Sequence, residues 1–466
     1  MSRPTSAWLL AGLLACTPST GSDTAGPSDA TGTTNTAETT DATDATDTAT
    51  APPPSLSAPA LAEDLDPAAD VLHVALTAAP HTWAAGDQLV EGFAYNGQVP
   101  GPTLRLKVGD QLVVDLQNDT GLDTSIHWHG LSVPYAMDGA GWQISPVPPG
   151  GAFRYTFTVA QPGTFWYHPH FDTERAVDLG LYGVVVVEDP ADPPVDEELV
   201  VVLDSIGEAD ADVADQGIEP SPLRWLANGQ IEPAWSVAAG TRARVRLVNV
   251  SNVGYVALDD VLVVAGDQGR LPEVRSSVVL PPGDRADLLW PVGPGSAHIA
   301  AYPFSMAGPG SGPPQRLFSV ESTGSGTASS DWPSAPAAPT PDPGRTDLRY
   351  TFTGQPGEGW EINGQTFPDI EPDEVALGAE VVLEIRNASP VHHPFHLHGM
   401  PFEVLSIDGE APSVRQLEDT LDIGIRQTAR LLIRADNAGD WMSHCHILPH
   451  AEQGMMTVLR VHDPDE

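Results

Sequence analysis

The chain has 466 residues, which predicts about two to four domains, each large enough to bury a core of its own. Its net charge of -42 should repel nucleic acid and anionic lipid headgroups, so neither is an expected partner. The charge mainly indicates solubility, and the alternative is that its field attracts cationic substrates or metal ions. The 44 Gly and 46 Pro favour a β-rich chain with many turns.

The N-terminus carries an export signal. A short apolar run over residues 7–15 follows Arg3 and ends at Leu13-Leu14-Ala15-Cys16; it is too short to span a bilayer as a mature helix. This ending resembles the bacterial lipobox, which implies that residues 1–16 are a lipoprotein signal peptide. Cys16 would then be acylated and anchor the chain in the cell envelope, at the periplasm or cell surface. The alternative is an ordinary signal peptide cleaved elsewhere.

The composition of two segments predicts flexible connections between folded parts of the chain. Residues 17–64 are rich in Thr, Ser, Ala, Asp, Gly and Pro, a composition that cannot offset the entropy of ordering. We expect a disordered tether there. Residues 322–345 are rich in Ser, Pro, Ala and Thr and are expected to form a linker.

An internal repeat divides the rest of the chain. The tripeptide Asn-Gly-Gln begins at Asn96, Asn228 and Asn363, at nearly equal spacing. Each copy is followed by a Gly, an alternating strand and an Asn, in the stretches 109–118, 240–249 and 378–387. Apolar residues at every second position predict strands with one buried face. We therefore expect an all-β chain of three tandem Greek-key β-sandwiches, over residues 65–190, 195–321 and 346–466.

Four His-x-His pairs fall in the first and last of these units. Residues i and i+2 of a strand point to the same face, so each pair presents two imidazoles side by side. Imidazole suits copper, zinc, iron and nickel. A single pair would be weak evidence for a metal, but four pairs predict a metal cluster between the two units. The pairs are His127/His129, His168/His170, His396/His398 and His444/His446.

The middle unit lacks these ligands. Leu258 and Asp260 stand where the other units have the first His-x-His pair. The middle unit is therefore expected to act as a spacer that folds the chain back.

The most specific motif is HCHILPHAEQGM, over residues 444–455. Along a strand, Cys445 should point away from His444 and His446. A thiolate, a second imidazole and an axial Met are the ligands of a blue-copper site. One short strand would then serve two metal sites. A buried inert thiol, the ordinary role of a lone Cys, is the alternative.

The motifs HWHG (127–130), WYHPH (166–170), HPFHLHG (393–399) and HCHILPHAEQGM resemble those of the multicopper oxidases. The likeness covers the chain from about residue 65 to its end and is greatest to three-domain bacterial laccases and cuprous oxidases. The segments NGQVPGPTLRLKVGD and PPGDRADLL also resemble the family. The resemblance implies cupredoxin-like domains and four copper ions, of which one is type 1, one type 2 and two type 3.

The resemblance also implies a set of ligands. Type 1 copper would be held by His393, Cys445 and His450, with Met455 axial, and type 2 copper by His127 and His396. The type 3 pair would be held by the remaining six histidines of the motifs, which are His129, His168, His170, His398, His444 and His446.

Two acidic residues are candidates for moving protons to the cluster. Asp138, which follows HWHG, matches an acidic residue that the family places near the cluster; the alternative is a simple turn residue before Gly139. Glu452 is a weaker candidate, because many bacterial relatives carry an acid directly after the last type 1 His, where this chain has Ala451. His73, His81, His298, His392 and His462 match no ligand position, although His392 is next to His393.

These observations predict an oxidase that takes electrons one at a time from a small reductant and passes them to dioxygen. Phenols are the favoured substrates, because the chain has only seven Met and lacks the Met-rich insert of many cuprous oxidases. Cu(I), Fe(II) or Mn(II) are the alternative substrates, and a copper-sequestering or electron-carrier lipoprotein is the non-enzymatic alternative. A monomer suffices, because all the motifs lie in one chain.

Overall fold

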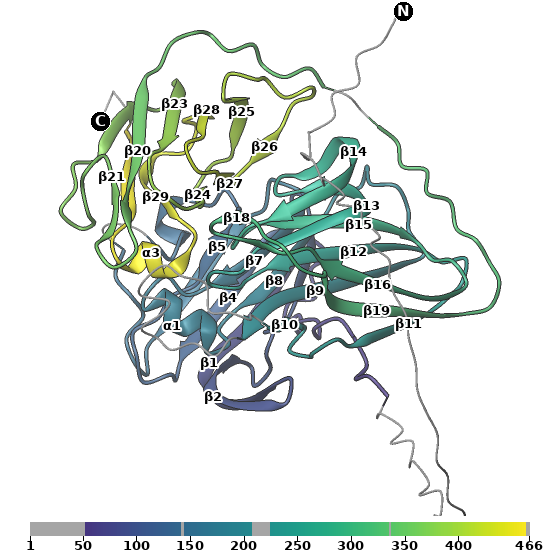
Figure 1. Cartoon of the computed structure of the whole chain (residues 1–466). Helices are drawn as coiled ribbons and strands as arrows, with labels where there is room; N and C mark the ends of the chain where they lie inside the picture. The colour runs from purple at the N-terminus through teal and green to yellow at the C-terminus, as the bar shows by residue number, and fades with distance from the viewer. Residues whose placement is uncertain (1–51, 141–143, 207–223, 335–336, 463–466) are drawn as a thin grey trace, which may run out of the picture. The chain divides into compact units, whose positions relative to one another are not determined.

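The computed structural model describes residues 52–140, 144–206, 224–334 and 337–462. The predicted signal peptide, Cys16 and residues 17–51 of the predicted tether lie outside the described residues. The rest is almost entirely β-structure, as predicted, with strands in successive pairs of sheets along the chain (Figure 1).

The first core lies between two four-stranded sheets, of order β2-β1-β4-β6 and β3-β8-β7-β5. Leu76 and Leu116 from one sheet and Leu106 and Val185 from the other are buried together. The strands are β1 (Val71–Ala85), β2 (Gln88–Tyr95), β3 (Leu104–Lys107), β4 (Gln111–Asn118), β5 (His127–His129), β6 (Ala152–Thr158), β7 (Gly163–His168) and β8 (Gly183–Glu188).

The middle core lies between a six-stranded sheet, β10-β9-β12-β15-β13-β14, and a three-stranded sheet, β11-β19-β16. Val201 and Val245 meet Phe318 there. The strands are β9 (Glu197–Ile206), β10 (Arg224–Ala227), β11 (Ala234–Ala238), β12 (Arg242–Asn249), β13 (Val256–Gly266), β14 (Gly269–Leu280), β15 (Arg285–Pro291), β16 (Gly295–Ala301) and β19 (Gln315–Thr323), beside the small hairpin β17 (Phe304–Ser305) and β18 (Gly308–Pro309).

The last core lies between the sheets β21-β20-β23-β28-β25-β26 and β22-β30-β29-β24-β27. Phe352 and Ile385 pack there with Phe395 and Trp441. The strands are β20 (Leu348–Gln355), β21 (Gly359–Ile362), β22 (Asp373–Ala376), β23 (Glu380–Asn387), β24 (His393–Leu397), β25 (Phe402–Ile407), β26 (Leu417–Glu418), β27 (Thr420–Ile423), β28 (Thr428–Arg434), β29 (Gly439–Cys445) and β30 (Met456–His462).

The repeated Asn residues have the same structural role in each unit. Asn118 closes the turn after β4 by donating from its side-chain amide to the carbonyls of Leu122 and Val147. Asn249 and Asn387 each donate to two main-chain carbonyls after β12 and β23 in the same way. A buried amide that satisfies two carbonyls at once explains why the repeat keeps Asn at the end of this strand.

The prediction of one buried face holds for β4 but is wrong for β12. In β4, Leu112, Val114 and Leu116 are buried and alternate with more exposed residues. In β12 all residues after Arg242 are buried. The second face of this sheet, including Val248, packs with Trp166 and Val184 of the first unit, so neither face of β12 meets solvent.

The predicted tether extends too far. Within residues 52–64, Leu56 is buried in the middle core, and its backbone N–H donates to the carbonyl of Ala234. The composition of the segment is polar overall, but one large apolar side chain and a strand edge to pair with are enough to hold it.

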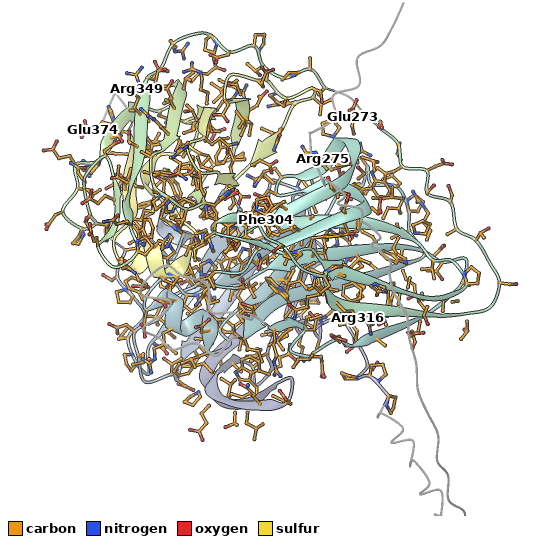
Figure 2. All side chains as sticks on the ribbon, viewed as in Figure 1. Glu273, Arg275, Phe304, Arg316, Arg349 and Glu374 are labelled. Atoms are coloured by element: carbon orange, nitrogen blue, oxygen red, sulfur yellow. The ribbon has the colours of Figure 1, made fainter. Side chains whose placement is uncertain are left out.

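The three helices among the described residues are short: η1 (Tyr135–Met137), α1 (Thr173–Asp178) and α3 (Leu448–Glu452). None of the helices in this part of the chain is long and apolar enough to cross a membrane. Charged side chains such as Arg349 on β20 and Glu374 on β22 (Figure 2) are mostly exposed, whereas the motif histidines are almost all buried.

Candidate metal centre

The strands bring the four His-x-His pairs together. β5 pairs with β7, which puts His127 opposite His168, and β24 pairs with β29, which puts His396 opposite His444. Histidine rings of the first unit then stack on histidine rings of the third unit. His129 stacks on His396 with ring centroids 3.8 Å apart, and His127 stacks on His398 at 3.9 Å.

The eight rings form overlapping groups that could hold metal ions. The potential ligand atoms of each group lie within 4.8 Å of one another. The groups are His127/His396/His398, His127/His129/His168 and His170/His398/His444. His446 completes the set, with its ring centroid 4.8 Å from that of His129. The residues predicted for the type 2 and type 3 sites thus lie in one cluster.

A second, separate group contains sulfur. Cys445 Sγ lies 3.4 Å from His393 Nδ1 and 3.6 Å from His450 Nδ1, and the two nitrogens are 3.2 Å apart. A point equidistant from three such atoms lies about 2 Å from each, close to a metal–imidazole bond length. Met455 is fully buried in the same core, and its carbonyl accepts from Cys445 N–H.

The hydrogen bonds leave particular ring nitrogens free for a metal. Main-chain carbonyls accept from Nδ1 of His127, His168, His396 and His444. Buried polar atoms normally have a partner, yet several imidazole nitrogens in this part of the chain have none. They are Nε2 of His127, His168, His396, His446 and His450, and Nδ1 of His129 and His446. The group around Cys445 offers a thiol, two imidazoles and a buried Met, and the other group offers imidazoles alone. Both sets of ligands fit copper.

Burial keeps the ligands in the state that a metal requires. It lowers the pKa of His168, His170 and His446 well below the ordinary value, helped by the charges of neighbouring histidines, and it lowers the pKa of His444 to about 3. Neutral imidazoles present a free lone pair. Burial also raises the pKa of the Cys445 thiol, so deprotonation there depends on a bound cation.

Asp138 touches two of the clustered rings. Its Oδ2 accepts from His398 Nδ1 at 3.0 Å, and its Oδ1 lies 3.2 Å from His127 Nδ1. The following residue, Gly139, has φ +69°, and a Cβ there would lie 1.8 Å from the carbonyl oxygen of Ile126. The turn therefore requires Gly139, and Asp138 is placed against the cluster.

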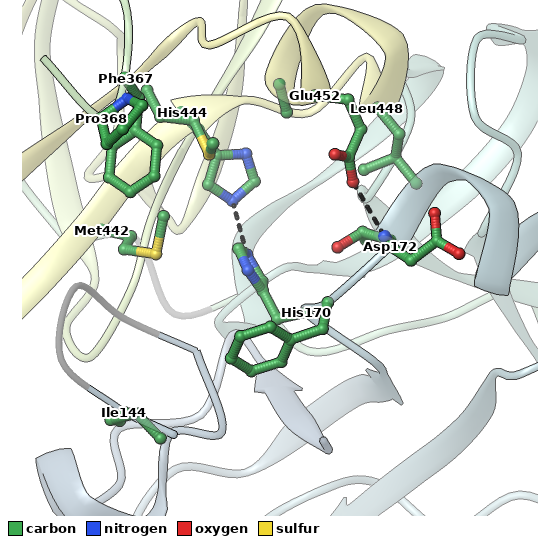
Figure 3. Close-up of a pocket in the computed structure, with 13 residues that line it drawn as sticks. Ile144, His170, Asp172, Phe367, Pro368, Met442, His444, Leu448 and Glu452 are labelled. Carbon is green, nitrogen blue, oxygen red and sulfur yellow. Dashed lines mark hydrogen bonds between the residues drawn. The ribbon is translucent and has the colours of Figure 1, made fainter. Parts of the chain in front are cut away.

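Glu452 lies at a cavity of about 450 Å³ that reaches the cluster. His170 and His444 line the cavity, and Figure 3 shows their rings in direct contact, with the two Nε2 atoms 3.5 Å apart. Glu452 Oε1 accepts from the backbone N–H of Thr173 at 2.9 Å. The carboxylate is thus fixed at the wall of the cavity that gives access to these two histidines.

The middle unit contributes residues that the sequence reasoning missed. Arg285, in the PPGDRADLL segment, is fully buried and forms an ion pair with Asp419 of the third unit. Asp419 Oδ1 lies 3.2 Å from His129 Nε2. Burial alone would raise the pKa of Asp419, but the charge of Arg285 and hydrogen bonds from it hold that pKa well below its ordinary value. The predicted role of the middle unit as a spacer is therefore incomplete.

The remaining histidines take no part in either group. His73 pairs with Asp115 at 2.9 Å on the first sheet. His392 Nδ1 pairs with Asp422 Oδ2 at 2.6 Å.

The chain is similar to known copper enzymes. The sequence profile described as multicopper oxidase matches residues 77–192 and 339–465. Multicopper oxidase MmcO of Mycobacterium tuberculosis is 30% identical over 440 residues, covering 82% of this chain and 86% of the relative.

Solved structures show the same cupredoxin-like fold. A multicopper oxidase from Campylobacter jejuni, titled a metallo-oxidase, has a TM-score of 0.76 at 23% identity, covering 88% of this chain and 96% of its own. A laccase-like multicopper oxidase, CueO, from an Ochrobactrum species, titled as acting on lignin model compounds, has a TM-score of 0.74 at 25% identity. That match covers 87% of this chain and all of the other. The chain therefore belongs to the multicopper oxidase family and is a copper-dependent oxidoreductase.

Proposed function

We propose that this enzyme oxidises phenols or similar small reductants one electron at a time and reduces dioxygen to water. Four such oxidations and four protons balance each dioxygen reduced to two waters. The observation that carries the proposal is the pair of distinct metal groups joined by one strand, β29, which supplies Cys445 to one group and His444 to the other.

In this proposal His393, Cys445, His450 and Met455 would hold a type 1 copper, and His127 and His396 would hold the type 2 copper. The type 3 pair is held by His129, His168, His170, His398, His444 and His446. Copper bound there supplies one-electron redox chemistry at the first site and dioxygen reduction at the second. The four copper ions and their types are part of the proposal.

Other groups of the chain hold the ligand rings in their orientations. The carbonyls of Asp138, Pro169, Asp419 and Cys445 fix four rings through Nδ1 and direct their Nε2 atoms towards the other histidines of the cluster, where those of His127, His168 and His396 have no partner among the described residues. Such contacts behind the ligands typically decide ring orientation and metal affinity. The cavity beside His170 and His444 offers dioxygen a route to the cluster.

We also propose that Asp138 relays protons to the cluster, with Glu452 as a weaker second donor. Asp138 Oδ2 is hydrogen-bonded to His398, and Glu452 lines the cavity. Asp138→Asn keeps an oxygen that can accept from His398 but cannot carry a proton, whereas Asp138→Ala removes both functions. Loss of turnover in both variants supports a relay. Full turnover and an unchanged pH profile in Asp138→Asn, with loss only in Asp138→Ala, would leave Asp138 a purely orienting role.

The class of reducing substrate is a separate part of the proposal. The scarcity of Met favours phenols, whereas the net charge of -42 favours a cation such as Cu(I), Fe(II) or Mn(II). The relatives point both ways, since one is titled a metallo-oxidase and another acts on lignin model compounds. A pure copper carrier would leave the large histidine cluster without a role.

Oxygen uptake by the copper-loaded chain beginning at residue 52 tests these alternatives. A dimethoxyphenol and Cu(I) are offered separately at matched concentrations. Faster uptake with the phenol supports the proposed activity, and faster uptake with Cu(I) supports the metal-ion oxidase. No uptake with either, despite full copper loading, would contradict both.

We further propose that the enzyme is exported, anchored to the cell envelope by lipid on Cys16, and active as a monomer with no other membrane contact. The lipobox-like sequence supports the anchor. Cys16→Ser should release the protein from the membrane fraction in cells, and retention of the variant there would contradict the proposal. Sedimentation of the soluble chain tests the monomer.

A further inference from the structure

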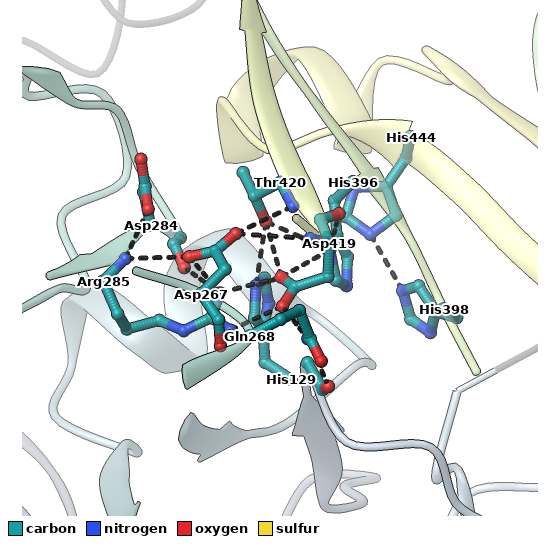
Figure 4. A network of polar contacts seen from close by, with 12 residues as sticks. His129, Asp267, Gln268, Asp284, Arg285, His396, His398, Asp419, Thr420 and His444 are labelled. Atoms are coloured by element: carbon teal, nitrogen blue, oxygen red, sulfur yellow. Dashed lines mark hydrogen bonds and ion pairs between the residues drawn. The ribbon is translucent and has the colours of Figure 1, made fainter. Parts of the chain in front are cut away.

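Arg285 lies where three parts of the chain meet. Its Nε donates to the carbonyl of Thr164 in the first unit at 3.0 Å. In the middle unit, its Nη1 is 2.9 Å from Asp267 Oδ1. Its two terminal nitrogens bind both oxygens of Asp419 in the third unit, at 2.7 and 2.5 Å. One fully buried guanidinium thus joins all three units, and Figure 4 shows Arg285 with Asp267 and Asp419.

The far side of Asp419 faces the histidine cluster. Its Oδ1 is 3.2 Å from His129 Nε2, and its main-chain carbonyl accepts from His396 Nδ1 at 2.9 Å. These are the two rings that stack at 3.8 Å. With one nitrogen of each ring held by Asp419, the partnerless nitrogens are His129 Nδ1 and His396 Nε2.

Two further residues of the middle unit fix Asp419 in place. Asp267 Oδ2 accepts from the backbone N–H groups of Thr420 and Asp419, at 3.0 and 3.3 Å. Gln268 Nε2 donates to Asp419 Oδ2 at 2.7 Å and to the carbonyl of Gly130 at 3.0 Å. The side chain and backbone of Asp419 are therefore both held from the middle unit.

The first unit is shaped to admit this ion pair. Gly130, the last residue of HWHG, has φ +86°, and a Cβ there would lie 2.5 Å from Arg285 Nη2 and 2.7 Å from Asp419 Oδ2. No side chain fits at this position. The glycine of the motif thus allows the ion pair to approach directly behind His129.

We propose that Arg285 and Asp267 are positioning residues for the copper cluster, acting through Asp419 on His129 and His396. The inference rests on the proposed function, because it takes these histidines as copper ligands. A buried carboxylate beside imidazoles is tolerated only when an opposite charge and hydrogen bonds satisfy it. Arg285 supplies that charge, so the middle unit helps to build a cluster whose ligands all come from the other two.

The test compares Arg285→Gln with Arg246→Gln in the full copper-loaded chain. Arg246 is the matched control, because it is buried in the middle unit and paired with Asp287 and Glu198 but does not bind Asp419. The readouts are copper per chain, the blue absorption of the Cys445 site, the type 2 EPR signal, and kcat and KM for the reductant. In Arg285→Gln we expect normal blue absorption, an altered type 2 signal and a roughly 10- to 100-fold weaker affinity for cluster copper. In Arg246→Gln we expect unchanged copper content and spectra.

An unaltered type 2 signal and full copper content in Arg285→Gln would overturn the inference. Equal spectral changes in both variants would also overturn it, because any lost ion pair of the middle unit would then have the same effect. If Arg285→Gln does not fold, Gln268→Leu removes the hydrogen bonds to Asp419 and to the carbonyl of Gly130 but keeps the ion pair between Arg285 and Asp419. A shifted type 2 signal in that variant supports the inference, and an unshifted signal overturns it. Wild-type protein that takes up no cluster copper would instead contradict the proposed function.

Discussion

Cys445 and His444 are neighbours on β29 but face different groups of ligands. Cys445 Sγ lies 3.4 Å from His393 Nδ1, whereas His444 Nε2 lies 3.1 Å from His398 Nε2. The alternation of side chains along a strand separates the two. A single peptide bond therefore joins the two proposed copper sites, which gives electrons a short covalent path.

This arrangement predicts that the two sites can be separated by mutation. Cys445→Ser should abolish the blue absorption and turnover with any reductant, because serine supplies no thiolate. The type 2 EPR signal should remain, since His127 and His396, the proposed type 2 ligands, are unchanged. Ser443→Ala, at a buried position of the same strand, is the control and should keep both signals. Loss of the type 2 signal in Cys445→Ser would contradict two separable sites.

Met455 and Met456 provide a second matched pair. Met455 is fully buried in the core around Cys445, whereas Met456 lines the cavity beside His444. Met455→Leu should raise the reduction potential of the blue site, because the axial ligand tunes it. Met456→Leu should leave that potential unchanged. A redox titration of the blue absorption measures both, and an equal potential in Met455→Leu and wild type would exclude Met455 as the axial ligand.

The ligand groups could be predicted because strand geometry is local. Pairs such as His127/His129 share a face on any strand, and the repeat indicated which units were equivalent. The structure does bring the predicted ligands together into two groups. The assignment of each ligand to a copper type stays a prediction.

The supporting residues could not be predicted, because they act over long sequence separations. Asp419 meets His129 across 290 positions of the chain, and nothing near either residue indicates the contact. Arg285 lies in a segment that resembles the family, but its partners follow only from the packing of three units. The burial of both faces of β12 was missed for the same reason.

Glu198 should give the folded chain a pH-dependent stability. Burial would raise its pKa, but Arg246, at 2.7 Å, and Arg105 lower it from 4.5 to about 2. A depressed pKa stabilises the fold above pH 4.5, and this contribution is lost as the pH falls towards 2. Glu198→Gln should cost on the order of 3 kcal/mol at pH 7.

Urea unfolding of Glu198→Gln and wild type at pH 7, 4 and 3 measures this difference. Glu188→Gln is the control, because Glu188 pairs with Arg105 and its side chain is 40% exposed. The difference in free energy of unfolding between wild type and Glu198→Gln should be largest at pH 7 and should decrease towards pH 3. The corresponding difference for Glu188→Gln should be small at every pH. If the difference for Glu198→Gln is the same at all three pH values, the ion pairs of Glu198 are not the cause of the lost stability.

Gly283 provides a direct test of how the middle unit contacts the cluster. Its φ is +91°, and a Cβ there would lie 2.8 Å from Cγ of His446. Gly295 has φ +96° and nothing within 4 Å of the same position. Alanine at either site should cost about 1–2 kcal/mol of stability through backbone strain. Only Gly283→Ala should also displace the His446 ring, which we expect to lower oxygen uptake at least about 10-fold and to alter the cluster spectra. Equal activity in the two variants would show that the His446 ring can move without consequence.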